Sequence, residues 1–167
     1  NKYLGLFSFA PRTFGETWIQ DHVQSLDNRF IKPSKKHDPE FQGEYDLLLD
    51  GIKVEVKACR AINTKIKGDM SAKALRTTST SPFWMNFQQL KVDMCDAFLF
   101  IGVWVDEIKY WVLTPEEVKK NPYYSPQHRG GIEYQIGIKE NNIQEFKEYE
   151  VEAIWVGEAI VEKCKGR

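Results

Sequence analysis

The clearest pattern of hydrophobic and polar positions runs from Gly43 to Cys59, where apolar and polar residues alternate on both sides of Asp50 and Gly51. Alternation with a period of two predicts β-strands, because successive side chains of a strand point to opposite faces. An Asp-Gly pair between two such runs favours the tight type I′ turn of a two-residue loop. The stretch therefore predicts an antiparallel β-hairpin.

The register of this hairpin places two acidic residues opposite each other. With a two-residue loop, Asp46 faces Glu55 and Glu44 faces Lys57, and these four side chains share one face. We expect the other face to be buried, because its residues are apolar or aromatic: Tyr45, Leu47, Leu49, Ile52, Val54 and Val56.

Two opposed carboxylates repel each other unless a cation lies between them. A hard divalent ion such as Mg²⁺ suits this role, since it takes oxygen ligands and is commonly held by one or two carboxylates together with a substrate phosphate. The alternative is a solvated face on which Glu44 and Lys57 form an ordinary cross-strand pair. That alternative gives no reason for Asp46 to face Glu55.

The remaining pattern mixes helices and strands. Apolar residues spaced three and four apart predict helices over residues 13–28 and 82–94, the first with a capping box from Thr13 to Glu16. The apolar run at 97–105 predicts a strand buried on both faces, followed by a hairpin strand at 108–113. Further along, the pattern predicts a short helix beginning after Thr114 and strands over residues 132–138 and 149–160.

Composition narrows the class of protein. A chain of 167 residues with 42% hydrophobic and 28% charged residues fits one globular domain, residues 1–167. It contains no apolar run long enough to span a membrane and no secretory signal, and its three widely spaced cysteines favour a reducing, cytoplasmic setting. Because it begins with Asn rather than Met, we expect the numbering to start inside a longer chain.

Charge is unevenly distributed along the chain, although the net charge is only −1. Residues 29–91, which surround the predicted hairpin, hold twelve basic and seven acidic residues, whereas residues 92–167 hold nine and fourteen. Such asymmetry favours a local basic surface on a nearly neutral protein, and an ordinary solvated surface is the alternative.

Asp46, followed by Glu55-Val56-Lys57 on the next strand, resembles the motif of the PD-(D/E)xK nuclease superfamily, which includes many restriction endonucleases. The chain departs from the motif at Tyr45, where the name of the motif has Pro. The resemblance implies an α/β fold with a restriction-endonuclease-like mixed central sheet flanked by helices. It also implies that Asp46, Glu55 and the carbonyl of Val56 bind Mg²⁺, while Lys57 assists catalysis.

The same resemblance suggests further residues near the site. Such nucleases often carry an acidic residue on the first helix, for which Glu16 is the candidate, in competition with its role in the capping box. They also often place a Gln or Lys from the helix after the second catalytic strand near the site, here Gln88 and Lys91, for which an exposed polar flank is the alternative. Basic and loop residues are the candidates for contacts with DNA. They are Lys35, Lys36, Arg60, Lys65, Lys67, Lys73, Arg76, Lys91, His128 and Arg129.

The sequence thus predicts a Mg²⁺-dependent DNA endonuclease, most similar to a type II restriction endonuclease, that acts on double-stranded DNA. Hydrolysis with products carrying 5′-phosphate ends is what the resemblance implies. A structure-specific or repair nuclease and a non-catalytic DNA-binding module on the same fold are the alternatives. Because cutting both strands usually needs two sites, we expect a homodimer.

Overall fold

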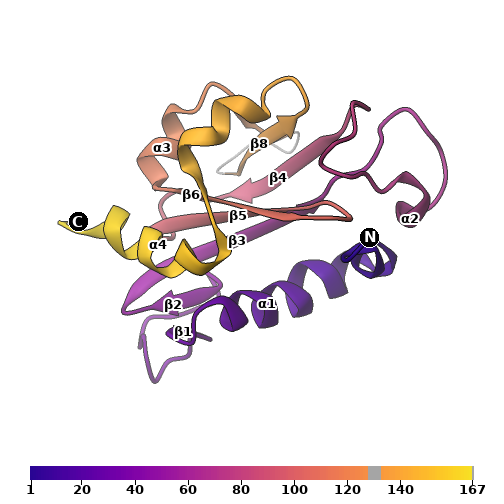
Figure 1. The fold of residues 1–167 in the computed structure, drawn as a ribbon. Coiled ribbons are helices and arrows are strands. Elements are labelled where there is room, and N and C mark those ends of the chain that lie inside the picture. The colour runs from indigo at the N-terminus through magenta and orange to yellow at the C-terminus, as the bar shows by residue number, and fades with distance from the viewer. Residues whose placement is uncertain (128–132, 167) are drawn as a thin grey trace.

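The computed structural model describes residues 1–127 and 133–166, and its centre is a six-stranded sheet (Figure 1). The strands follow the order β1-β2-β3-β5-β6-β9. Their bounds are β1 (Phe30–Ile31), β2 (Leu47–Leu49), β3 (Ile52–Arg60), β5 (Ala97–Val103), β6 (Ile108–Leu113) and β9 (Glu150–Val151). β3 and β5 are parallel, whereas the other neighbouring pairs are antiparallel. The predicted mixed sheet is therefore confirmed.

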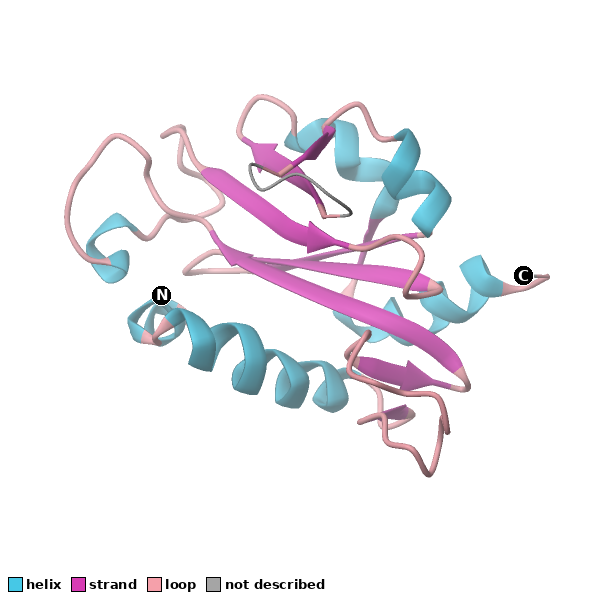
Figure 2. Ribbon diagram, turned by 180° about the vertical axis from the view of Figure 1, so that it is seen from behind, coloured by secondary structure: helices cyan, strands magenta, loops and turns pink. Residues whose placement is uncertain are grey.

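Helices cover one face of this sheet (Figures 1 and 2). The N-terminal helix spans residues 11–26 and comprises a π-helical stretch, η2 (Thr13–Trp18), and α1 (Ile19–Leu26). It packs on the sheet together with η1 (Leu4–Ser8) and the C-terminal helix α4 (Val156–Cys164). The buried residues of this core include Phe14, Val23 and Ile160 from the helices.

A second, three-stranded antiparallel sheet covers the opposite face, with strand order β4-β8-β7. Its strands are β4 (Trp84–Leu90), β8 (Tyr134–Lys139) and β7 (Tyr124–Pro126). Phe87 of β4 stacks on Phe100 of β5 with ring centroids 4.6 Å apart, which joins the two sheets. The short helices α3 (Pro115–Lys120) and η3 (Ile143–Tyr149) pack on this side, whereas α2 (Met70–Lys73) and η4 (Ala153–Trp155) lie on the side of the N- and C-terminal helices.

The central strand β5 is buried along its whole length, as its apolar run predicts. Leu99 and Ile101 face the helices, whereas Phe98 and Phe100 face the second sheet. The two faces of β3 are divided in the same way, and this division decides which side chains can meet in a site. Val54 and Val56 face the helices, so Glu55 and Lys57 face the side of the second sheet.

Three predicted elements are wrong. Residues 82–94 do not form a helix, because β4 pairs with β8 and buries alternate residues, Met85 and Phe87. Of the strand predicted at 149–160, only β9 forms, and Val156 begins a helix whose buried face includes Ile160 one turn later. The capping box at Thr13 is also absent, because the helix begins two residues earlier and Thr13 and Glu16 already lie within it.

In the part of the chain that the structure describes, no helix combines the length and the apolar character needed to cross a membrane. Among the described residues, Cys59, Cys95 and Cys164 form no disulfide bond with one another.

Candidate functional site

The β2–β3 hairpin forms with the predicted turn and register. Asp50 and Gly51 both have positive φ angles, 49° and 82°, as a type I′ turn requires. Leu47 pairs with Val54 and Leu49 pairs with Ile52, which is the register that a two-residue loop imposes. The turn that the sequence predicts therefore sets the alignment of Leu47 and Leu49 with the second strand.

The chain departs from regular pairing at Asp46, just before β2. The amide of Asp46 donates to the carbonyl of Val54 at 3.1 Å, and Oδ2 of Asp46 accepts a hydrogen bond from the amide of Val56 at 2.8 Å. The sequence predicted that Tyr45 and Leu47 share one buried face. In the structure Tyr45 is buried on the other side, in the core between the two sheets. The Asp46 carboxylate is thus fixed against the backbone of β3, between the positions of Glu55 and Lys57.

Glu55 and Lys57 project from the same face of β3 and are largely shielded from solvent. Their side chains are 13% and 21% exposed, and Nζ of Lys57 lies 3.9 Å from Oε1 of Glu55. The structure therefore brings together Asp46, Glu55 and Lys57, as the sequence predicts.

The two carboxyl groups cannot both be charged at low cost in this environment. Burial, a hydrogen bond with Asp46 and the negative charge of Asp46 together raise the pKa of Glu55 to about 9. The positive charges of Lys57 and Lys91 lower the pKa of Glu55, but they do not offset these effects. A proton or a cation must therefore lie between the carboxyl groups near neutral pH.

The donor set fits a hard divalent cation better than a structural zinc ion. Asp46 and Glu55 supply carboxylate oxygens, and the carbonyl of Val56 is a further oxygen donor on the same strand. Among residues 1–127 and 133–166, no group of three or more His, Cys, Asp or Glu side chains is arranged to hold a metal. Two carboxylates suffice for Mg²⁺, which keeps several water ligands and often takes its remaining ligands from a phosphate.

Lys91 lies near this pair, but it comes from a strand and not from the predicted helix. β4 runs alongside β3 in the antiparallel direction, since Asn63 pairs with Phe83 and the thiol of Cys59 donates to the carbonyl of Asn86 at 3.3 Å. The residues after Asn86 therefore lie progressively closer to Glu55. In agreement with this, the positive charge of Lys91 lowers the pKa of Glu55. Lys91 also pairs with Glu133, with Nζ 3.8 Å from Oε1.

Gln88 lies on the exposed side of β4, between Asn86 and Lys91. A β-bulge follows it, where Gln89 adopts a φ of 57°. The predicted helical setting of Gln88 is therefore wrong, because the residue lies in a strand.

Glu16 is not brought to the pair. It forms an ion pair with Arg12 one turn earlier, with Nε 3.2 Å from Oε2, and its side chain is 66% exposed. Its helix packs on the face of the sheet opposite Glu55. Glu16 is therefore placed neither in a capping box nor beside the two carboxylates.

Arg60 has a structural position that the sequence did not reveal. Its guanidinium donates to the carbonyls of Leu6 and Phe9 at 3.0 and 2.8 Å, lies over the ring of Phe14 and is 8% exposed. Burial lowers the pKa of Arg60 from its ordinary value. The prediction that Arg60 contacts DNA is corrected, because this side chain holds the N-terminal segment against β3.

The other predicted basic residues lie on two loops. Lys35 and Lys36 are exposed before the hairpin, in a loop that is tied down by the hydrogen bond from Tyr45 to Asp38 at 2.8 Å. Residues 61–82 form the second loop, where the basic side chains are exposed except for the half-buried Lys73; they are Lys65, Lys67, Lys73 and Arg76. His128 and Arg129 lie outside the described residues.

Backbone hydrogen bonds hold the second loop against the end of β3. The amide of Asn63 donates to the carbonyl of Lys73, the amide of Leu75 donates to the carbonyl of Ala61, and Leu75 is buried. Its lysines are therefore presented from a backbone that is attached to the end of β3.

Asp96 is a positioning residue that sequence reasoning missed. Its carboxylate accepts from the amide of Lys53 at 2.9 Å, and its amide donates to the carbonyl of Lys53 at 2.8 Å. These bonds align the beginnings of β3 and β5. An acidic residue directly before a buried strand was the available signal, but its partner lies 43 residues away.

The arrangement combines oxygen ligands for a cation with a neighbouring ammonium group. Such a combination suits the binding and polarisation of a phosphate, because both charges can stabilise negative charge on its oxygens. No protein-family model matches this chain, and a comparison with curated proteins finds no significant match.

Proposed function

We propose that this chain is a Mg²⁺-dependent DNA endonuclease with a restriction-endonuclease-like fold. The observation that carries the proposal is the convergence of Asp46, just before β2, with Glu55 and Lys57 of β3 in a shielded setting. The mixed sheet, with the parallel pair β3 and β5 at its centre and helices on its face, supports the same proposal. The fold alone does not identify a function, so the proposal rests on these side chains.

The roles of the residues follow from their positions. Asp46 and Glu55 would hold the cation, and Mg²⁺, when bound, would polarise the scissile phosphate and acidify a water molecule. The ammonium of Lys57, 3.9 Å from Glu55, would stabilise the negative charge that develops on the phosphate oxygens. Lys91 adds a second positive charge near Glu55, and this charge would attract the phosphate backbone.

The low exposure of these side chains increases the effect of each charge. Less water lies between the charged groups, so electrostatic interactions are stronger than on an open surface. The hydrogen bond from the Val56 amide keeps the Asp46 carboxylate in place before any ligand binds. A preorganised site of this kind avoids part of the reorganisation that the reaction would otherwise require.

The test is cleavage of mixed plasmid and phage DNA by the wild type and by Lys57→Ala, each with Mg²⁺ or with EDTA. We expect discrete Mg²⁺-dependent fragments from the wild type and a rate lower by about a hundredfold or more in the variant. Lys109→Ala is a matched control, since Lys109 of β6 and Glu150 of β9 form a similarly shielded ion pair at 3.5 Å.

Each outcome of this test separates the proposal from its competitors. Cleavage that survives Lys57→Ala would place the chemistry elsewhere, and binding without cutting across several divalent metals would favour a non-catalytic DNA-binding module. Preferential cutting of branched or nicked DNA would indicate a structure-specific nuclease. Cutting of both strands would require two sites, so we expect the protein to have the mass of a dimer when it is bound to DNA.

A further inference from the structure

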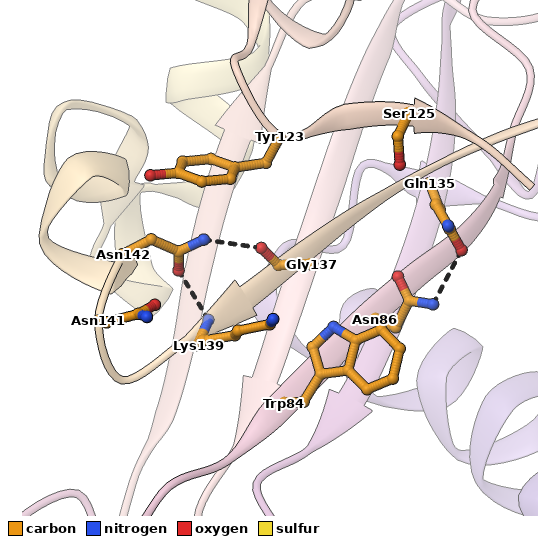
Figure 3. A pocket seen from close by; sticks show the side chains of 9 residues that line it. All are labelled: Trp84, Asn86, Tyr123, Ser125, Gln135, Gly137, Lys139, Asn141 and Asn142. Carbon is orange, nitrogen blue, oxygen red and sulfur yellow. Dashed lines mark hydrogen bonds between the residues drawn. The ribbon is translucent and has the colours of Figure 1, made fainter.

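A separate cavity of about 290 Å³ lies on the outer face of the second sheet, where residues of β4, β7 and β8 surround it (Figure 3). Trp84 and Tyr123 lie on opposite sides of Gly137, while Asn86 and Gln135 close one end. Its volume is at the lower end of the range for small-molecule sites, which suits a ligand with one ring system. None of these residues belongs to the group formed by Asp46, Glu55 and Lys57.

Trp84 supplies a flat apolar surface in this cavity. The indole is 50% exposed, and its five-membered ring lies above Gly137 of the neighbouring strand. A Cβ atom at position 137 would lie 2.5 Å from Nε1 of Trp84, so only glycine allows this placement of the ring. Lys139, the cross-strand partner of Trp84, has its Nζ 5.6 Å from the ring centroid and adds a positive charge at the rim.

The polar wall of the cavity contains an amide side chain of fixed orientation. Nδ2 of Asn86 donates to Oε1 of Gln135 at 3.0 Å, which orients the Asn86 amide, while Oδ1 of Asn86 is buried without a partner. A buried acceptor of this kind is costly unless a ligand or a water molecule donates to it. Asn142 makes the neighbouring wall rigid, since it bonds the amide of Lys139 at 2.7 Å and the carbonyl of Gly137 at 2.9 Å.

We propose that this cavity binds one unpaired nucleobase. The base would stack on Trp84, place its polar edge against the amide side chains of Asn86 and Gln135, and leave its phosphate close to Lys139. Among the described residues that line the cavity, Lys139 is the one charged side chain and there is no carboxylate, which favours an anionic ligand with a planar ring. Unpaired bases are commonly recognised by aromatic stacking combined with hydrogen bonds to their edges.

The position of the cavity relates it to the proposed catalytic residues. Trp84, Asn86 and Gln88 occupy alternate positions along β4. The chain then continues to Lys91, which is close enough to Glu55 for its charge to lower the pKa of that carboxyl group. Asn86 and Lys91 are five residues apart, and because the strand is bulged between them their Cα atoms lie at most about 16 Å apart. One nucleic-acid strand can therefore occupy both places. This relationship rests on the proposed function, whereas base binding by the cavity does not.

The test measures binding in EDTA, where cleavage is not required. The anisotropy of a labelled single-stranded oligonucleotide and the calorimetric titration of nucleoside monophosphates distinguish a base within a polymer from a free nucleotide. Trp84→Ala should weaken binding about 5- to 100-fold, the range expected for the loss of one stacked base. Trp155→Ala is the matched control, because Trp155 is 56% exposed and lies on η4, away from the cavity.

A second variant tests the cavity without removing the ring. Gly137→Ala should displace the indole and weaken binding to a similar degree, with folding checked by circular dichroism. Equal affinities of Trp84→Ala and Trp155→Ala, absence of binding to any of these ligands, or saturable binding of an oligosaccharide instead would each overturn the proposal. Base binding by a protein that never cuts DNA would reject the proposed nuclease and leave this inference intact.

Discussion

The amide of Val56 donates a hydrogen bond to Oδ2 of Asp46 at 2.8 Å, across the two strands of the β2–β3 hairpin. This bond turns the Asp46 carboxylate towards the strand that carries Glu55 and Lys57. It forms where regular pairing ends, because β2 begins only at Leu47. The irregular step before β2 is therefore what brings the two acidic side chains into contact, at an electrostatic cost that the protein bears in the absence of a cation.

That cost predicts how stability depends on pH. The pKa of Glu55 rises from 4.5 to about 9 on folding, so between these values the unfolded chain has lost a proton that the folded chain keeps. The free energy of unfolding should then fall as pH rises, with a slope that approaches about 1.4 kcal/mol per pH unit. Glu55→Gln should remove this slope in urea unfolding from pH 5 to pH 9 with EDTA.

The exposed Glu40 provides the control for this measurement. Glu40→Gln should leave the slope of the wild type unchanged, because its carboxyl lies in a solvated loop. If Glu55→Gln and the wild type lose stability in parallel as pH rises, the two carboxyl groups are not coupled in the way that their contact implies.

The same contact predicts that Mg²⁺ stabilises the folded protein in the absence of DNA. A cation bound to Asp46 and Glu55 relieves their repulsion, and a ligand at a hundred times its Kd adds about 2.7 kcal/mol to the free energy of unfolding. Thermal unfolding of the wild type should therefore shift upwards with Mg²⁺, while Asp46→Asn and Glu55→Gln should show little shift. An equal shift in all three proteins would place the bound cation at another site.

Arg60 and the lysines of the following loop should respond to mutation in opposite ways. Arg60→Ala leaves the carbonyls of Leu6 and Phe9 without their donor and removes the cation from Phe14, so it should lower the free energy of unfolding by about 3 kcal/mol. The double variant Lys65→Ala, Lys67→Ala should retain stability but reduce the dependence of DNA affinity on salt.

Urea unfolding and DNA titrations over a series of salt concentrations measure the two effects separately. A folded, stable Arg60→Ala protein that binds DNA weakly would restore the original prediction that Arg60 contacts the phosphate backbone. A double lysine variant with the salt dependence of the wild type would remove this loop from the proposed DNA surface.

Residues within the hairpin were enough to predict it. The elements that were predicted wrongly depend on residues that are distant in the sequence. Asp50 and Gly51 set the turn and the register within a few residues, so the alignment of Leu47 with Val54 needed no further information. By contrast, Phe83, Phe87 and Leu90 have a spacing that also fits a helix. β4 forms because it pairs with β8, which lies about fifty residues further along the chain.

The same distinction applies to the candidate residues. Asp46, Glu55 and Lys57 meet through neighbouring strands, and the sequence pattern contained that relationship. Arg60 was misassigned because the carbonyls that accept its hydrogen bonds lie more than fifty residues earlier. Glu16 was misassigned because the helix begins before the expected cap, so that Glu16 pairs with Arg12 within it. The cavity at Trp84 was not predicted at all, since Gly137 and Gln135 reach it only through the pairing of β4 with β8.

The last prediction concerns the turn that aligns the two carboxylates. Gly51 has a φ of 82°, and nothing lies within 4 Å of a Cβ atom added there, so Gly51→Ala would strain only the backbone. We expect a loss of about 1 kcal/mol in the free energy of unfolding, as for a non-glycine residue held in the left-handed region. Cleavage at saturating Mg²⁺ should fall much less than in Lys57→Ala, because the bond from Val56 to Asp46 still fixes the carboxylate.

Gly5→Ala is the control, since this glycine has no positive φ and equally open space. If Gly51→Ala instead abolishes cleavage while the protein stays folded, the turn itself, and not the bond from Val56, sets the position of Asp46.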